Sequence, residues 1–194
     1  MLNIVIIGAP GCGKGKHSTH ICKKYELVHI STGDILREEI ELHTELGESI
    51  KQFIDNGYLV PFDIVTRKII VNSIKNKKAK GFLFDGYPRT LHQAEILDAL
   101  LKSRKKEISL VLSLDVEEIE LYRRILHRSE KSRRTDDTEE VIKNRLKVYQ
   151  EQTLPLLNYY DTQGKLYHIN GMAPEEVVFE RISKVIDFII NKKN

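Results

Sequence analysis

The chain has 194 residues, a length that suits one domain with a sizeable buried core. Hydrophobic residues make up 41% of it and charged residues 30%, which is typical of globular proteins and argues against a disordered chain. The 31 basic and 28 acidic residues leave a net charge of +3, which is too small to indicate nucleic-acid binding.

Short apolar runs alternate along the chain with longer amphipathic segments. Continuous apolar runs are typical of parallel strands covered on both faces, and these predict strands at residues 2–7, 27–30, 82–84, 108–114 and 166–169. The amphipathic segments predict helices at residues 14–25, 91–105, 117–127, 138–160 and 174–190. This alternation predicts an α/β fold with a doubly wound, five-stranded parallel sheet. The mostly helical stretch 32–80 exceeds a simple crossover and predicts a small helical insertion.

A glycine-rich loop follows the first predicted strand. Residues 8–14 read Gly-Ala-Pro-Gly-Cys-Gly-Lys and lead directly into a predicted helix. Glycines let backbone N–H groups point into one concavity, and the helix N-terminus adds the positive end of its dipole. Lys14 supplies a cation for phosphate oxygens. A glycine-rich turn with a chance lysine is the alternative, and the strand–loop–helix context argues against it.

The metal ligand expected after such a loop is missing. Gly15 stands where a standard P-loop carries the Ser or Thr that binds Mg²⁺. Either the metal is held elsewhere, or the chain belongs to a subgroup that reads Gly-Lys-Gly. Asp85 ends the third predicted strand, at the sheet edge that faces the ligand in this fold class, and is the candidate metal carboxylate.

Four motifs together resemble the adenylate kinase family. They are GAPGCGKG from residue 8, STGDILR at 31–37, DGYPRT at 85–90 and RRTDD at 133–137. The resemblance covers nearly the whole chain and implies one P-loop domain over residues 1–194. It implies a core at 1–30, 61–126 and 138–194, a monophosphate-binding insertion at 31–60, and a short lid at 127–137. That lid has no cysteines, so no zinc is expected.

On the acceptor side, the resemblance implies a binding site for AMP. Arg37 and Arg89 resemble the arginines that grip the monophosphate, and Gln93 resembles the residue that reads the adenine edge. The other residues implied for this site are Thr32, Tyr58, Leu59, Val60, Gly86, Tyr87, Pro88, Arg134 and Arg145.

On the donor side, the resemblance implies a binding site for ATP. Arg124 resembles the arginine that stacks on the donor adenine, and Arg128, one helical turn later, resembles a phosphate ligand at the base of the lid. The other residues implied for this site are Gly11, Cys12, Gly13, Lys14, Gly15, Lys16 and Ala173.

The chemistry implied is transfer of the γ-phosphoryl group of ATP to AMP, with Mg²⁺, to give two ADP. The implied catalytic residues are Lys14, Arg89, Arg128, Arg134 and Arg145. Any one arginine taken alone is better explained as a surface cation paired with glutamate. Several at motif-matched positions favour phosphoryl transfer, because the transition state spreads negative charge over three oxygens.

Several residues depart from the family pattern. In the phosphate loop, Cys12, Lys16 and His17 replace Ser, Thr and Gln, and in the lid Ser129 and Arg133 replace glycines. Lys16 is expected either to disturb the α-phosphate or metal geometry or to supply part of the metal's charge. Two alternative functions therefore stay open. One is a kinase for CMP or UMP, against which Thr32 and Gln93 argue, and the other is a weakly active nucleotide-binding paralogue that acts as a sensor or scaffold.

The expected setting is the cytoplasm. Two cysteines, Cys12 and Cys22, are too few for a disulfide framework, and Cys12 in its basic loop is expected to be the more reactive thiol. No apolar run approaches the ~20 residues of a membrane span, and the N-terminus lacks a basic segment and a cleavage site. We expect a monomer whose partners are ATP and AMP, with no nucleic acid and no membrane.

Overall fold

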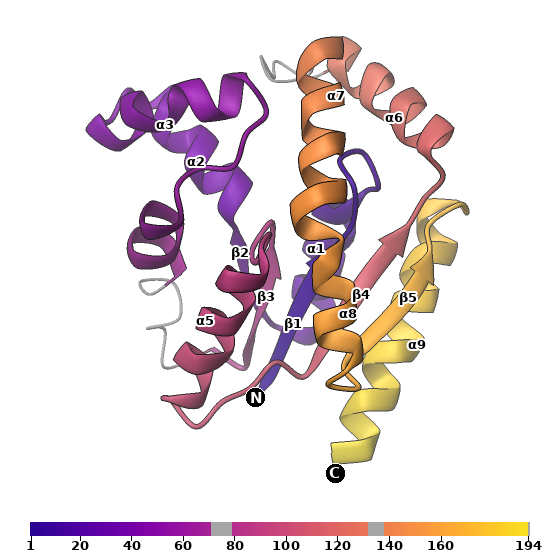
Figure 1. Ribbon diagram of the computed structural model, residues 1–194. Coiled ribbons are helices and arrows are strands. Elements are labelled where there is room, and N and C mark those ends of the chain that lie inside the picture. The colour runs from indigo at the N-terminus through magenta and orange to yellow at the C-terminus, as the bar shows by residue number, and fades with distance from the viewer. Residues whose placement is uncertain (71–78, 132–137, 194) are drawn as a thin grey trace.

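The computed structural model describes residues 1–70, 79–131 and 138–193 (Figure 1). The first half of the chain forms β1 (Leu2–Ile7), α1 (Lys14–Tyr25), β2 (Val28–Ser31), α2 (Thr32–Glu41), α3 (Glu45–Asp55), the π-helical segment η1 (Ile64–Ile70) and β3 (Gly81–Asp85). The second half forms α5 (Leu91–Lys102), β4 (Leu110–Asp115), α6 (Glu118–Lys131), α7 (Glu139–Val148), the π-helical segment η2 (Tyr149–Thr153), α8 (Pro155–Asp161), β5 (Leu166–Asn170) and α9 (Glu175–Lys193).

The sheet is parallel throughout, with the strand order β2-β3-β1-β4-β5. From β1 the chain crosses to the edge strand β2 and returns to β3, which lies between them. It then crosses to β4 and β5 on the other side of β1, so the connections that leave β1 and β3 run in opposite directions. In α/β sheets the ligand crevice lies outside the carboxyl ends of the strands at such a reversal. The register brings the end of β3 beside the ends of its neighbours, because Asp85 pairs with Ser31 of β2 and with Ile6 of β1. The predicted fold class is confirmed.

Each face of the sheet is covered by its own set of helices. Alternate residues of β1 pack on opposite faces of the sheet. Val5 and Ile7 pack with buried residues of α5 and α8, whereas Ile4 and Ile6 pack with buried residues of α1 and α9. All four of these strand residues are buried, which explains why the strand reads as an unbroken apolar run. In Figure 1, α5 and α8 lie across the front of the sheet, whereas α2 and α3 stand away from it at the upper left.

Side-chain caps fix where the helices of the site begin. The hydroxyls of Ser31, Thr90 and Thr138 each accept a hydrogen bond from a backbone N–H in the first turn of α2, α5 and α7, respectively. A cap of this kind satisfies a donor that has no partner within the helix and contributes about 1 kcal/mol. These three helices carry Arg37, Gln93 and Arg145, so the caps set the positions of predicted site residues.

The predicted boundaries differ most from the structure after residue 138. The single helix expected at residues 138–160 is α7 and α8 separated by the π-helical segment η2, in which the N–H of Leu154 donates to the carbonyl of Tyr149 at 2.8 Å. Pro155 explains the change, because a proline has no N–H and its ring clashes with the carbonyl four residues earlier. The helix expected at 117–127 continues to Lys131 and enters the predicted lid. The division into core, insertion and lid stays a prediction.

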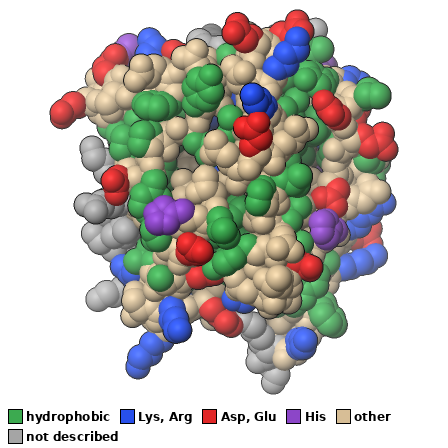
Figure 2. All heavy atoms as spheres, in the orientation of Figure 1, with side chains coloured by type: hydrophobic (Ala, Val, Ile, Leu, Met, Phe, Trp, Pro, Cys, Tyr) green, Lys and Arg blue, Asp and Glu red, His purple; other side chains and the backbone are tan. Residues whose placement is uncertain are grey.

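The surface carries charges of both signs. On the face drawn in Figure 2, Lys and Arg side chains lie among Asp and Glu side chains and hydrophobic ones, as the small net charge leads one to expect. Within the residues that the structure describes, no helix is long and apolar enough to cross a membrane.

Candidate active site

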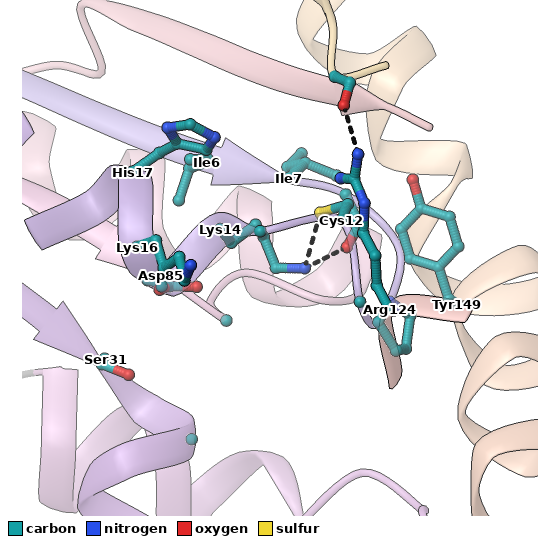
Figure 3. A pocket seen from close by; sticks show the side chains of 18 of the residues that line it. Ile6, Ile7, Cys12, Lys14, Lys16, His17, Ser31, Asp85, Arg124 and Tyr149 are labelled. Atoms are coloured by element: carbon teal, nitrogen blue, oxygen red, sulfur yellow. Dashed lines mark hydrogen bonds between the residues drawn. The ribbon is translucent and has the colours of Figure 1, made fainter. Parts of the chain in front are cut away.

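Two adjoining cavities lie at the carboxyl ends of the strands. The larger has a volume of about 850 Å³ and is bordered by the glycine-rich loop, the beginning of α1, Asp85 and Arg124 (Figure 3). The smaller has a volume of about 50 Å³ and lies between α2, residues 57–60 and the beginning of α5. Both are bordered by Arg37, Arg89 and Arg145. This arrangement offers two binding places that meet at three arginines.

The glycine-rich loop wraps around the Lys14 side chain. Gly11 and Gly13 have φ angles of 85° and 99°, a backbone conformation that glycine adopts without steric cost. Gly13 caps α1, and Lys14 is the first residue of that helix. The Lys14 ammonium donates to the carbonyls of Gly8 and Ala9 and lies 3.5 Å from Cys12 Sγ (Figure 3). A cation and a helix N-terminus thus meet in one concavity, as an anion site requires.

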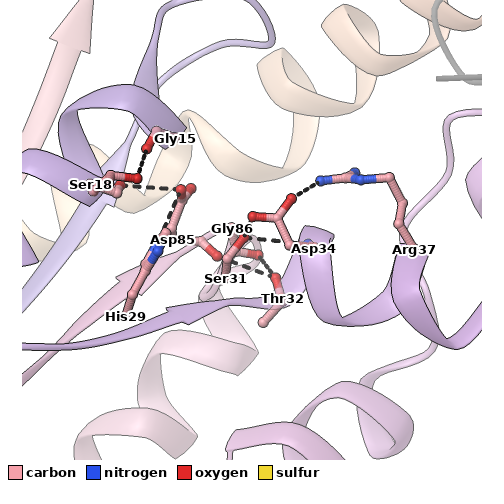
Figure 4. Close-up of polar contacts among 10 residues, drawn as sticks. Gly15, Ser18, His29, Ser31, Thr32, Asp34, Arg37, Asp85 and Gly86 are labelled. Atoms are coloured by element: carbon pink, nitrogen blue, oxygen red, sulfur yellow. Dashed lines mark hydrogen bonds and ion pairs between the residues drawn. The ribbon is translucent and has the colours of Figure 1, made fainter. Parts of the chain in front are cut away.

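Asp85 is a buried carboxylate at the edge of the larger cavity. The hydroxyl of Ser18 donates to Asp85 Oδ2 at 3.2 Å, and His29 Nε2 lies 3.5 Å from the same oxygen (Figure 4). Burial by itself raises the pKa of the Asp85 carboxyl, but the His29 imidazole, the Lys14 ammonium and the Ser18 hydroxyl together hold the pKa below its ordinary value. Asp85 is therefore ionised at neutral pH. No motif in the sequence pointed to Ser18 or His29.

The smaller cavity carries the residues expected around the acceptor base. The Thr32 hydroxyl donates to the carbonyl of Gly86 at 2.9 Å, which ties the beginning of α2 to the loop after β3 (Figure 4). The side-chain amide oxygen of Gln93 accepts from the backbone N–H of Arg89 at 2.7 Å. Thr32 and Gln93 are both buried. Tyr58, Leu59 and Val60 also line this cavity, as do Gly86 and Arg37.

Tyr87 is placed differently from its neighbours in the same motif. Its side chain lines neither cavity and is 1% exposed, with its hydroxyl 3.0 Å from that of Thr66. Gly86 and Pro88 on either side of it border the larger cavity. The family resemblance implied that Gly86, Tyr87, Pro88 and Arg89 all belong to the acceptor site, whereas the Tyr87 side chain belongs to the core.

The arginines at the junction have defined partners. Arg89 Nε donates to the carbonyl of Gly86 at 2.8 Å, and the carbonyl of Arg89 accepts from Thr153 at 3.0 Å. Arg37 forms an ion pair with Asp34, one turn earlier on α2 (Figure 4). Arg145 approaches from α7 and borders both cavities. Three guanidinium groups from three elements thus converge, which suits a site that binds phosphate oxygens.

Arg124 joins α6 to the loop after β5. Its Nε donates to Glu120 at 2.7 Å and its terminal nitrogen donates to the carbonyl of Gly171 at 3.0 Å (Figure 3). Ala173 borders the same cavity. The arrangement fits the predicted place of the donor base. The side chains of Arg128 and Ser129 and the whole of Arg133 and Arg134 lie outside what the structure describes.

The substituted phosphate-loop positions make contacts that the sequence did not predict. Lys16 Nζ lies 3.1 Å from a carboxylate oxygen of Glu175, at the beginning of α9, so its side chain bridges two helices in this structure. His17 is 5% exposed, and burial is the main cause that lowers the pKa of its imidazole, although the Glu175 carboxylate opposes the shift. Nothing in the sequence pattern pointed to Glu175, which lies 159 residues from its partner.

The cysteines are the clearest correction. Cys12 was expected to be an open, reactive thiol, but it is 2% exposed and packs in the hydrophobic core against the sheet. A thiol must be accessible to react, so Cys12 is not the open thiol that its place in the basic loop predicted. Burial and the Asp85 carboxylate raise the pKa of Cys22 to about 12, which disfavours its thiolate.

Comparison with known proteins gives a consistent result. The family model described as "Adenylate kinase" matches residues 6–165. The chain is 50% identical over 187 residues to the adenylate kinase of Bacteroides fragilis, covering 96% of this chain and 99% of the relative. It is also 50% identical over 188 residues to the adenylate kinase of Azobacteroides pseudotrichonymphae, covering 96% and 98%, and 44% identical over 189 residues to that of Flavobacterium psychrophilum, covering 96% and 99%.

Proposed function

The chain belongs to the adenylate kinase family, and we propose that it transfers the γ-phosphoryl group of ATP to AMP, giving two ADP. The observation that carries this proposal is the pair of adjoining cavities that share Arg37, Arg89 and Arg145. Transfer between two nucleotides requires two binding places whose phosphates meet at cationic groups.

The larger cavity is proposed to bind the donor. The backbone N–H groups of the loop and the Lys14 ammonium face the donor phosphates, which is the arrangement that helix N-termini offer to anions. Arg124 and Ala173 lie at the end of this cavity that we assign to the adenine. The Glu120 carboxylate and the Gly171 carbonyl orient the Arg124 guanidinium, so it is positioned before a nucleotide arrives.

The smaller cavity is proposed to bind the acceptor base. Thr32 and Gln93 supply buried polar groups there, and Leu36 and Val65 supply apolar walls. A buried polar group that pairs with one base edge rejects a base that leaves it without a partner. This favours AMP over CMP or UMP. Arg37 and Arg89 then lie between the base and the donor phosphates.

The transfer step is proposed to depend on positioning and charge. An oxygen of the acceptor phosphate is already anionic, so no general base has to remove a proton before it attacks. Lys14, Arg89 and Arg145 stabilise the charge that develops on the transferred group, and we assign the same role to Arg128 and Arg134. Arginines suit this task because the guanidinium fork matches two phosphate oxygens at once.

Asp85 is the proposed protein ligand of Mg²⁺. Mg²⁺ prefers hard oxygen ligands, and Asp85 supplies an ionised oxygen at the border of the phosphate cavity. Within the described part of the chain, no group of three or more His, Cys, Asp or Glu side chains could hold a metal by itself. That fits a cation shared between one carboxylate, directly or through water, and the phosphates of a nucleotide. When bound, Mg²⁺ would neutralise phosphate charge, and the contacts of Ser18 and His29 with Asp85 Oδ2 would hold the carboxylate in place.

A coupled assay of ADP formation tests the function. ATP with AMP should turn over at roughly 10 s⁻¹ or faster, an ordinary enzyme rate. CMP, UMP and GMP offered in place of AMP should react much more slowly. Preference for CMP or UMP would overturn the acceptor assignment. Tight nucleotide binding with turnover orders of magnitude lower would support instead the weakly active paralogue, which Lys16 and the lid substitutions favour.

The setting and the assembly state are further proposals. We assign the chain to the cytoplasm as a monomer, because its two cysteines are not paired with each other and the described residues of one chain form the larger cavity of the proposed site. Light scattering coupled to size-exclusion chromatography tests the monomer: a mass well above 22.5 kDa would contradict it.

A further inference from the structure

Lys16 and Glu175 form an ion pair at the edge of the donor cavity. Lys16 belongs to the first turn of α1 and Glu175 to the first turn of α9, and both border the larger cavity. Their charged atoms are 3.1 Å apart, and the Lys16 side chain is 75% exposed. Figure 3 shows Lys16 leaving the same end of α1 as Lys14 and His17. The second phosphate-loop lysine is thus held by a carboxylate outside the loop.

The helix dipoles act on the two partners in opposite ways. A cation in a first helical turn is disfavoured by the helix dipole, and the first turn of α1 contains no acidic residue to offset Lys16. A carboxylate in a first turn is favoured, so Glu175 is stabilised by α9 even without Lys16. His20 Nδ1 also lies 3.8 Å from the other oxygen of Glu175. Lys16 therefore depends on the pair more than Glu175 does.

A polyphosphate is a stronger partner for Lys16 than one carboxylate. Ion pairs this exposed contribute little to stability, because water screens the charges and two long side chains must be held in place. A nucleoside triphosphate bound at the loop brings several negative charges to the turn that carries Lys16, together with the N–H groups of that turn. It is then favourable for Lys16 to exchange the Glu175 carboxylate for a phosphate as its partner.

We infer that Lys16 leaves Glu175 to bind the phosphates of the donor, and that Glu175, by competing for Lys16, sets the affinity of this chain for nucleoside triphosphates. The inference rests on the proposed function only in taking ATP as the donor. It makes Lys16 a specificity residue for the number of phosphates, because adenosine offers it no charge. It also predicts that an acidic side chain outside the loop weakens donor binding.

A second ion pair between the same two helices provides a matched control. Lys24 Nζ lies 3.3 Å from Asp187, again joining α1 to α9, but neither residue borders the larger cavity. If the Lys16–Glu175 pair only fastened α9 to α1, breaking the Lys24–Asp187 pair would have a comparable effect on ATP binding. If Lys16 is a phosphate ligand, only the first pair matters to ATP.

The experiment measures dissociation constants for ATP, ADP and adenosine by calorimetry at low and moderate salt. Glu175→Gln should tighten ATP binding and Lys16→Thr should weaken it, each by roughly two- to fivefold at low salt and less at moderate salt. The effects should be smaller for ADP and absent for adenosine. In the Lys16→Thr background, Glu175→Gln should change ATP affinity by less than about twofold, since the competition has been removed. Lys24→Thr and Asp187→Asn should leave ATP binding unchanged.

Three results would overturn the inference. Unchanged ATP affinity in Lys16→Thr would mean that Lys16 never reaches the phosphates. Weaker ATP binding in Glu175→Gln would mean that the pair supports the site. Equal effects in the control variants would mean that helix docking is responsible, and thermal unfolding without nucleotide would then show matching losses. These measurements need no turnover, so absence of ADP formation would contradict the proposed function and leave this inference standing.

Discussion

The side-chain oxygen of Gln93 accepts a hydrogen bond from the backbone N–H of Arg89 at 2.7 Å, so the residue proposed to read the acceptor base also holds the one proposed to bind its phosphate. The two are one helical turn apart, and the Thr90 hydroxyl between them caps α5 by accepting from the Gln93 N–H at 3.3 Å. Base recognition and phosphate binding are thus linked within five residues.

Replacing Gln93 by alanine should therefore affect AMP in two ways. The variant loses a polar group at the base and frees the Arg89 backbone, so the KM for AMP should rise by about tenfold, as expected for loss of one or two buried hydrogen bonds. Discrimination against CMP should fall with it. Steady-state kinetics with each nucleotide varied in turn provide the measurement.

The ATP side gives the control for Gln93→Ala. The dissociation constant of ATP should stay unchanged, because Gln93 borders only the smaller cavity. Gln163→Ala, a change at an exposed glutamine that bonds Asp98, should leave both nucleotides unaffected. A loss of ATP affinity with intact AMP affinity would mean that the two cavities have been assigned in reverse.

Arg89→Ala should reduce kcat/KM by about a hundredfold or more, because it removes a charge-assisted contact to phosphate. The melting temperature should change little, since the backbone carbonyl that bonds Thr153 is kept while the bond from Nε to the carbonyl of Gly86 is lost. Arg104→Ala removes a comparable bond, to the carbonyl of Leu100, at a residue that borders neither cavity, and should leave the kinetics unchanged. A large fall in melting temperature for Arg89→Ala alone would show that Arg89 is structural.

The sequence predicted the elements whose boundaries are set locally. The strand Leu2–Ile7 and the helix Lys14–Tyr25 have the predicted bounds, because an apolar run stops at a glycine and a glycine caps the helix that follows. The helix expected at residues 138–160 was wrong in its interior, where Pro155 comes after a π-helical segment. Proline acts on the backbone before it, and periodicity does not reveal how the helix adjusts.

The candidate site was predicted at the positions that motifs specify and missed where contacts join distant segments. Lys14, Arg89 and Arg145 border the larger cavity as a resemblance to the family implies. The partners that orient site residues were missed, because His29 reaches Asp85 and Glu175 reaches Lys16 only once the sheet has formed. A hint existed for His29, because it belongs to the strand beside the one that Asp85 ends and is two residues from Ser31, which pairs with Asp85.

Asp85 should make stability depend on pH in the acid range. Its pKa is held below the ordinary value of 3.8, so the unfolded chain binds a proton there before the folded chain does as the pH falls. The stability contributed by ionised Asp85 is therefore complete above that ordinary value and is lost as the pH falls from there toward the folded pKa. Asp85→Asn has no such group, so the difference in unfolding free energy between parent and variant should shrink between about pH 5 and pH 3. Urea titrations across that range measure it, and a constant difference would contradict the assignment.

His17 should make stability depend on pH nearer neutrality. Burial lowers the pKa of its imidazole below the ordinary 6.5. As the pH falls, the imidazole therefore takes up a proton at a higher pH in the unfolded chain than in the folded chain. The unfolding free energy should consequently decrease from pH 7.5 to pH 5.5 by more in the parent than in His17→Gln, which places a neutral side chain at the same position. Urea unfolding of both proteins at several pH values measures the difference. His92→Gln, at an exposed histidine, is the matched control. If His92→Gln reduced the pH dependence of the unfolding free energy as much as His17→Gln does, the effect would not come from burial of His17. Identical pH profiles for the parent and His17→Gln would show that the imidazole is free to take up its proton within the folded chain.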